Sequence, residues 1–189
     1  YDGTTIVAMG ADQELISANG AVIEMRVLSP EVGTKVKLKL ENAQLAYNDK
    51  DQHAVEVDMF TTAANSWETL SFDFGSAEGL NHDYVYNKAT VFFDFGNNGA
   101  GETYYFDNVS YAKSSTSAYN VPSNAQITFD AGDTSGYDLF SWGGQQTTVI
   151  TSDTPAGATG AVAKVTKTGG PYDGTTIVAM GADQELISA

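Results

Sequence analysis

The sequence predicts an all-β fold, an antiparallel β-sandwich, on three observations. Apolar and polar residues alternate within many short segments, as in strands that bury one face. These segments recur roughly every 8 to 15 residues, with glycine, proline and asparagine turns between them. The one helix candidate is a short stretch at 11–17. Because so many one-sided strands must bury their apolar faces, they are expected to form two packed sheets.

The clearest strand is at 35–41, where Val36, Leu38 and Leu40 alternate with lysines and are expected to face inward. Other segments with the same pattern or strong β propensity are 21–28, 54–60, 67–74, 88–95, 103–111, 126–131, 136–142, 146–151, 159–167 and 174–180. Turns are expected at Ser29-Pro30, 97–99, 143–144 and 169–171.

A long exact duplication organises the chain. Residues 1–18 read YDGTTIVAMGADQELISA, and residues 172–189 read the same, at an offset of 171 residues. Identity over 18 positions is not chance. It indicates either nearly identical tandem copies or a duplicated end, and we favour tandem copies.

The boundaries of the repeating module follow from a linker. Residues 112–125 are rich in serine, alanine and asparagine and lack apolar periodicity, so we interpret them as an inter-repeat linker. The module then begins with 126–189, its N-terminal part, and ends with its C-terminal part in 1–111, where 19–111 are unique and 1–18 duplicate 172–189. The chain is therefore predicted to be circularly permuted relative to the natural module.

Charge and composition exclude several function classes. Nine basic and 24 acidic residues give a net charge of −15, which disfavours nucleic acid and anionic membrane surfaces as partners. No apolar run approaches the roughly 20 residues of a membrane-spanning helix. The absence of cysteine excludes disulfides and thiolate metal sites.

Four segments carry a resemblance to a known family. They are ITFDAGD (127–133), the strand pair at 22–43, NSWETLSFDFG (65–75) and ATVFFDFGNNGAGETYYFDNVSYA (89–112). This pattern resembles the β-jelly-roll carbohydrate-binding modules of extracellular bacterial polysaccharide-degrading enzymes and adhesins, in the galactose-binding-like group. The resemblance implies a jelly roll, non-catalytic binding of polysaccharide, and a secreted or cell-surface location.

The resemblance also implies a structural Ca²⁺ near the two ends of the module. In the family the ion is held by an acidic residue of the opening segment and an aspartate of the closing segment, here Asp130 and Asp107. Asp133 lies in the adjacent loop and is a further candidate, since Ca²⁺ takes six to eight oxygen ligands. The alternative is that these aspartates only cap turns and face water.

Aromatic residues are the candidates for sugar contact, because the apolar faces of sugar rings stack on flat aromatic surfaces. The family often has an aromatic before a G-T-T segment, here Tyr172 or its duplicate Tyr1. Trp142 precedes a glycine pair and is either a stacking surface or a lid on the core. Tyr84 flanks a loop, and Trp67 starts a strand, where packing is favoured over ligand contact.

Lys35, Lys37 and Lys39 share one strand face. They would either meet an acidic polysaccharide or protect an edge strand, and we favour a solvated role. Catalysis is disfavoured: Glu56 and Asp58 begin a Glu-x-Asp-x-x-Glu pattern known from sandwich glycosidases, but no second glutamate follows.

Two functions are consistent with these features. The first is calcium-stabilised binding of polysaccharide, most readily a neutral glycan given the negative charge. The second is a structural repeat of an extracellular fibre or adhesin that self-associates through the duplicated segment. That segment contains a predicted strand, Thr4–Met9, identical to Thr175–Met180, although one module offers one place for it.

Overall fold

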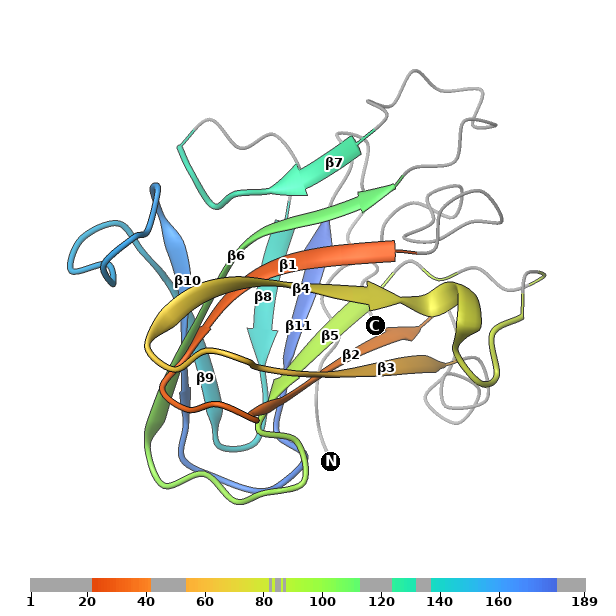
Figure 1. Cartoon of the computed structure of the whole chain (residues 1–189), viewed down its shortest axis with the longest axis horizontal. Helices are drawn as coiled ribbons and strands as arrows, with labels where there is room; N and C mark the ends of the chain where they lie inside the picture. Colours follow the sequence, from red (N-terminus) through yellow and green to blue (C-terminus); the bar gives the residue numbers. More distant parts are fainter. Residues whose placement is uncertain are drawn as a thin grey trace, which may run out of the picture.

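The computed structural model describes residues 22–41, 54–81, 83, 86, 88–112, 124–131 and 137–179. In this part of the chain, eleven strands form two antiparallel sheets packed face to face (Figure 1). The predicted all-β sandwich is confirmed. Among the same residues, no helix is long and apolar enough to cross a membrane.

The two sheets divide the strands without regard to chain order. The first sheet runs β4 (Ser66–Asp73), β1 (Val22–Ser29), β6 (Glu102–Ala112), β10 (Val162–Lys167) and β9 (Gln145–Ile150), and β7 (Asn124–Ile127) also pairs with β6. The second sheet runs β3 (Val55–Phe60), β2 (Lys35–Glu41), β5 (Lys88–Phe93), β11 (Thr175–Ala179) and β8 (Tyr137–Ser141). A single 3₁₀ turn, η2 (Phe74–Ser76), follows β4 in the described residues.

Each of the eleven predicted segments overlaps one of these strands. β6 ends at Ala112 and β7 begins at Asn124, so both strands extend into the ends of the predicted linker 112–125. The largest differences are at two ends: β7 stops at Ile127, and β10 begins at Val162. Phe129, just after β7, has a φ of 60°, a left-handed conformation that does not continue a strand. The helix candidate at 11–17 and the predicted strand Thr4–Met9 lie outside the described residues.

The core lies between the sheets and follows the alternation read from the sequence. Val36, Leu38 and Leu40 of β2 are at most 1% exposed, and they belong to one buried cluster with apolar residues of β1 and β4. Burying each such side chain stabilises the fold by roughly 1.5–3 kcal/mol. Next to them lies a buried aromatic column of Phe93, Tyr104, Phe106 and Phe129.

Three connections meet at one end of the sandwich, at the bottom of Figure 1, which we call the loop end: 94–101, 142–144 and 168–174. Backbone hydrogen bonds join them, from Gly96 N to Pro171 O (2.8 Å) and from Thr168 N to Gly144 O (2.8 Å). The fully buried Lys167 ammonium donates to two backbone oxygens here, those of Phe93 (2.9 Å) and Asp94 (2.8 Å). Burial lowers the pKa of Lys167, although nearby Asp94 opposes this.

Candidate functional site

Two of the predicted ligand-binding residues meet at the loop end, on the outer face of the second sheet. Trp142 follows β8 and Tyr172 precedes β11. Phe92 packs edge-on against Trp142, with ring centroids 5.8 Å apart, and lies 5.3 Å from Phe95. Phe95 is in turn 5.3 Å from Tyr172. We call Phe92, Phe95, Trp142 and Tyr172 the aromatic patch.

Burial divides the aromatic patch into a base and a surface. Phe92 is only 7% exposed, so it supports the other rings. Tyr172 is 61% exposed, and Trp142 and Phe95 are partly exposed. A large exposed aromatic fixed by neighbouring rings has little conformational entropy left to lose when a flat ligand stacks on it.

Glycines and one carboxylate explain why the chain adopts this arrangement. Trp142 N donates to Gly174 O (3.1 Å), and a Cβ on Gly174 would lie 2.7 Å from the Phe92 ring and 2.9 Å from Trp142 Cζ2. Only glycine therefore allows the two rings to close over this strand. Asp173 accepts a hydrogen bond from Gly144 N (2.7 Å), which ties the turn of Tyr172 to the turn after Trp142.

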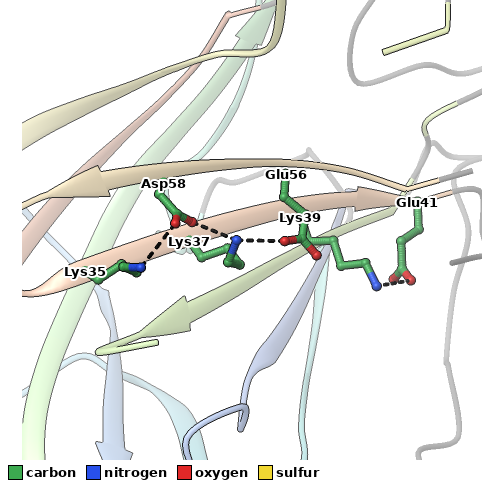
Figure 2. Close-up of polar contacts among 6 residues, drawn as sticks. All are labelled: Lys35, Lys37, Lys39, Glu41, Glu56 and Asp58. Carbon is green, nitrogen blue, oxygen red and sulfur yellow. Dashed lines mark hydrogen bonds and ion pairs between the residues drawn. The ribbon is translucent and has the colours of Figure 1, made fainter. Parts of the chain in front are cut away.

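A network of ion pairs covers the other half of the same face (Figure 2). Lys37 lies between Glu56 (2.7 Å) and Asp58 (2.8 Å) of the neighbouring strand. Glu41 accepts from Lys88 at 2.8 Å and Lys39 at 3.1 Å. We call the full set the charged ladder, made up of Lys35, Lys37, Lys39, Glu41, Glu56, Asp58 and Lys88.

The ion pairs decide the pKa directions of Glu41 and Lys37. Burial alone would raise the pKa of Glu41, but Lys88 and Lys39 outweigh it and lower that pKa. Burial alone would lower the pKa of Lys37, but its bonds to Asp58 and Glu56 raise it instead. Both groups therefore stay charged over a wider pH range than in water.

The predicted role of the lysines as edge protection is wrong. β2 lies between β3 and β5, so it is not an edge strand. The solvated interpretation also fails for Lys37, whose side chain is 10% exposed. Strand order in a sheet depends on tertiary topology, which the alternation of a single strand does not encode.

The ladder and the patch join into one surface across all five strands. The Lys37 ammonium lies over the Phe95 ring, 4.7 Å from its centroid, and Lys35 lies 5.6 Å from the ring of Phe60. Phe60, at the end of β3, is 51% exposed. Four strand spacings separate β3 from β8, so the surface from Phe60 to Trp142 is roughly 19 Å wide.

Two of the predicted metal ligands lie at one junction of the first sheet. β6 pairs with β10 up to Phe106 and with β7 from Val109 onward, so Asp107 lies where the partner changes. Asp107 is 2% exposed, and its Oδ1 accepts from Asn108 N (2.7 Å). Asp130 follows β7 and accepts from Ala161 N (2.8 Å), just before β10.

Two of the three predicted calcium ligands, Asp107 and Asp130, lie in the described part of the chain. No group of three or more histidine, cysteine, aspartate or glutamate residues that could hold a metal occurs in the described part of the chain. Asp133 lies outside that part. Asp130 occupies the space of a missing side chain, since a Cβ on Gly160 would be 2.1 Å from its Oδ1.

Trp67, another predicted ligand residue, does not join the patch. Trp67 lies on the first sheet, where the Arg26 guanidinium covers its ring at 4.4 Å and Arg26 also donates to Gly157 O. This is the packed environment favoured for Trp67 from the sequence. Tyr84 and Tyr1 lie outside the described residues.

Sequence reasoning missed Phe60, Phe92 and Phe95. The signal for the last two was present in the run Phe92-Phe93-Asp94-Phe95, which has more aromatics than an inward-facing strand needs. Phe93 is fully buried, so its neighbour Phe92 must lie on the outer face. The comparisons with known proteins add no family: no protein-family model, curated protein or solved structure matches the chain.

Proposed function

We propose that this chain is a non-catalytic carbohydrate-binding module that binds polysaccharide along the outer face of its second sheet. The observation that carries the proposal is the gathering of Trp142 and Tyr172 on the support of Phe92 and Phe95. A fixed aromatic surface beside hydrogen-bonding side chains is the arrangement that sugar rings require. The surface is wide enough for several sugar units, which fits an extended chain rather than a single sugar.

The charges favour a neutral glycan. Every lysine of the charged ladder already has a carboxylate partner within 3.4 Å. An anionic sugar would therefore have to displace an existing pair, against a net charge of −15. The hydroxyl groups of a neutral glycan can instead accept from and donate to the ladder without breaking it.

The proposal includes a structural Ca²⁺ at the junction of β6, β7 and β10, with Asp107, Asp130 and Asp133 as ligands. Two carboxylates at one strand junction support it, and backbone carbonyls would supply the other oxygens. EDTA is then expected to lower the melting temperature, and added Ca²⁺ to restore it. An Asp130→Asn variant should respond to neither. A secreted or cell-surface location belongs to the same proposal.

Replacing Trp142 tests the binding function, because this residue has no duplicate elsewhere in the chain. Trp142→Ala should weaken binding to a recognised neutral polysaccharide about 10- to 100-fold, equivalent to about 1.4–2.8 kcal/mol. Tyr105→Ala is the matched control, since this partly exposed tyrosine lies on the first sheet. Binding is measured by affinity electrophoresis and calorimetry, with circular dichroism to check the fold. Equal effects of the two variants, or no binding to any glycan of a broad panel, would contradict the proposal.

A second candidate function is a structural repeat of an extracellular fibre or adhesin that assembles by strand exchange. The identity of β11 with residues 4–8 favours it. It predicts concentration-dependent assembly without glycan, which light scattering measures directly. The aromatic patch has no role in this alternative, so Trp142→Ala should leave such assembly unchanged.

A further inference from the structure

β11 occupies a slot that a second segment of the chain fits equally well. The strand pairs with β5 on one side and β8 on the other, and its Ile177 is 2% exposed in the core. Its sequence, TTIVA, also occurs at residues 4–8, inside the 18-residue duplication. Because the letters are identical, both segments would make the same side-chain contacts with β5 and β8. We propose that residues 4–8 are a second β11, able to occupy this slot in their own chain.

If residues 4–8 occupy the β11 slot, the chain must run from the end of β11 to the start of β1. The strand directions place these two points at the same end of the sandwich. Ile177 pairs with Ala89, so β11 ends beside the start of β5, and Lys88 there pairs with Glu41 at the end of β2. β1 begins at Val22, which pairs with Asp73 at the end of β4. Lys35 pairs with Phe60, and Lys35 O accepts from Phe95 N, so the connection 61–65 between β3 and β4 lies at the loop end. The end of β4 therefore lies at the opposite end of the sandwich. The end of β11 and the start of β1 therefore lie at the same end (Figure 1).

The connection is long enough. β3 contacts β4 and β8 contacts β9, so the sheets stack with β11 about two strands sideways from β1. Two strand spacings and one sheet separation amount to roughly 14 Å. Residues 9–21, which join the second copy to β1, can span up to about 43 Å when extended.

The same chain is the favoured donor over a second copy. A tethered strand competes at an effective concentration of about millimolar, far above the micromolar concentration of another molecule. Each chain carries two copies of the strand for one slot, so exchange between molecules gains no contacts. We therefore expect the two identical segments of one chain to fill its slot, and dimers would instead support the strand exchange of the second candidate function.

The exchange would preserve the aromatic patch. The duplication begins at Tyr172 and includes Asp173 and Gly174, so the second copy brings Tyr1, Asp2 and Gly3 to the same positions. What it lacks are the hydrogen bonds of the preceding residues, such as Gly99 N to Gly169 O. The binding surface thus has two sources for its most exposed tyrosine.

Matched substitutions in the full chain test this redundancy. Ile177→Asp places an unpaired charge in the β11 slot, and Ile6→Asp makes the identical change in the second copy. We expect Ile6→Asp alone to leave the melting temperature unchanged. Ile177→Asp should stay folded, and the double variant should melt at least about 10 °C lower than Ile177→Asp or lose its cooperative transition.

The comparison of Ile177→Asp with the double variant tests whether residues 4–8 can replace β11. If the double variant and Ile177→Asp behave alike, whether both are folded or both unfolded, residues 4–8 do not replace β11 and the proposal is overturned.

A cross-link identifies the donor chain. Thr90 and Thr176 pair across β5 and β11 with hydroxyl oxygens 3.3 Å apart, and Thr5 is the duplicate of Thr176. Because the chain has no cysteine, Thr5→Cys with Thr90→Cys in the Ile177→Asp background gives one defined pair. A cross-linked monomer on a non-reducing gel is the expected result. Cross-linked dimers, or no cross-link where the Thr90→Cys/Thr176→Cys control forms one, would overturn it.

Discussion

The two halves of the outer face of the second sheet differ in whether their side chains are partnered within the protein or left exposed to solvent. In the charged ladder, each buried charge has partners within the sheet, such as Glu41 with Lys88 and Lys39. In the aromatic patch, Tyr172 leaves 61% of its surface uncovered although its ring is fixed against Phe95. The ladder has little to gain from a ligand, whereas the patch gains by covering apolar surface. The ladder should therefore govern stability, and the patch should govern binding.

The largest expected effect is on stability, from breaking the ladder at its most buried carboxylate. Glu41→Gln should lower the free energy of unfolding by about 2–3 kcal/mol, because Lys88 is left as a buried cation with no carboxylate partner among the described residues. Glu56→Gln is the matched control: its side chain is 42% exposed, and Lys37 keeps Asp58, so about 1 kcal/mol or less is expected. Urea unfolding measures both. Equal losses would show that burial does not set the strength of these pairs.

The next effect should separate the two halves, since it breaks the patch without touching the ladder. Gly174→Ala places a methyl group against Phe92 and Trp142, so the rings must move apart. We expect a loss of about 1–3 kcal/mol in stability and a clear loss of glycan affinity. Gly170→Ala, where a Cβ would lie 3.4 Å from Asp173 Oδ1, should change stability by no more than about 0.5 kcal/mol. Unchanged affinity in the folded Gly174→Ala protein would separate the patch from binding.

A smaller effect on stability is expected when the pH is lowered. In the folded protein, burial would raise the pKa of Glu41, but Lys88 and Lys39 outweigh burial and lower this pKa. The stabilisation that ionised Glu41 gives the fold is therefore fully present above the pKa of glutamate in the unfolded chain, about 4.3. It is lost as the pH falls through the lower pKa of Glu41 in the folded protein. The difference in stability between the wild type and Glu41→Gln should narrow below about pH 5. Urea midpoints between pH 3 and pH 7 measure this, and a constant difference would contradict it.

The sequence predicted the strands better than the site, for a physical reason. Alternation in β2 is a local property, so Val36, Leu38 and Leu40 could be assigned to the core directly. The contact of Phe92 with Trp142 joins residues far apart in the chain through β11, and no local pattern encodes it. Trp142 is predicted from the glycine pair that follows it, and Tyr172 only from the resemblance, which places an aromatic before the G-T-T segment. Their common location is a product of strand order.

The calcium prediction shows the same limit. The resemblance implies Asp107 and Asp130 as ligands, and the structure brings both to the junction where β6 changes partner. The pairing of β7 with β6 produces this proximity. The binding of Ca²⁺ by Asp133 stays a prediction, as does the binding of polysaccharide.

The smallest expected effect is the response of glycan binding to salt. Raising NaCl from 0.05 M to 1 M shortens the Debye length to about 3 Å, which weakens exposed charge interactions most. If the patch binds a neutral glycan while the ladder keeps its own ion pairs, affinity should change less than about twofold. A parallel titration with an anionic polysaccharide provides the control, because any binding it shows should disappear with salt. A tenfold loss for the neutral glycan would place the ladder's lysines in the binding site and remove the division between the two halves. An unchanged affinity, together with the loss in Trp142→Ala, would assign recognition to stacking on the aromatic patch.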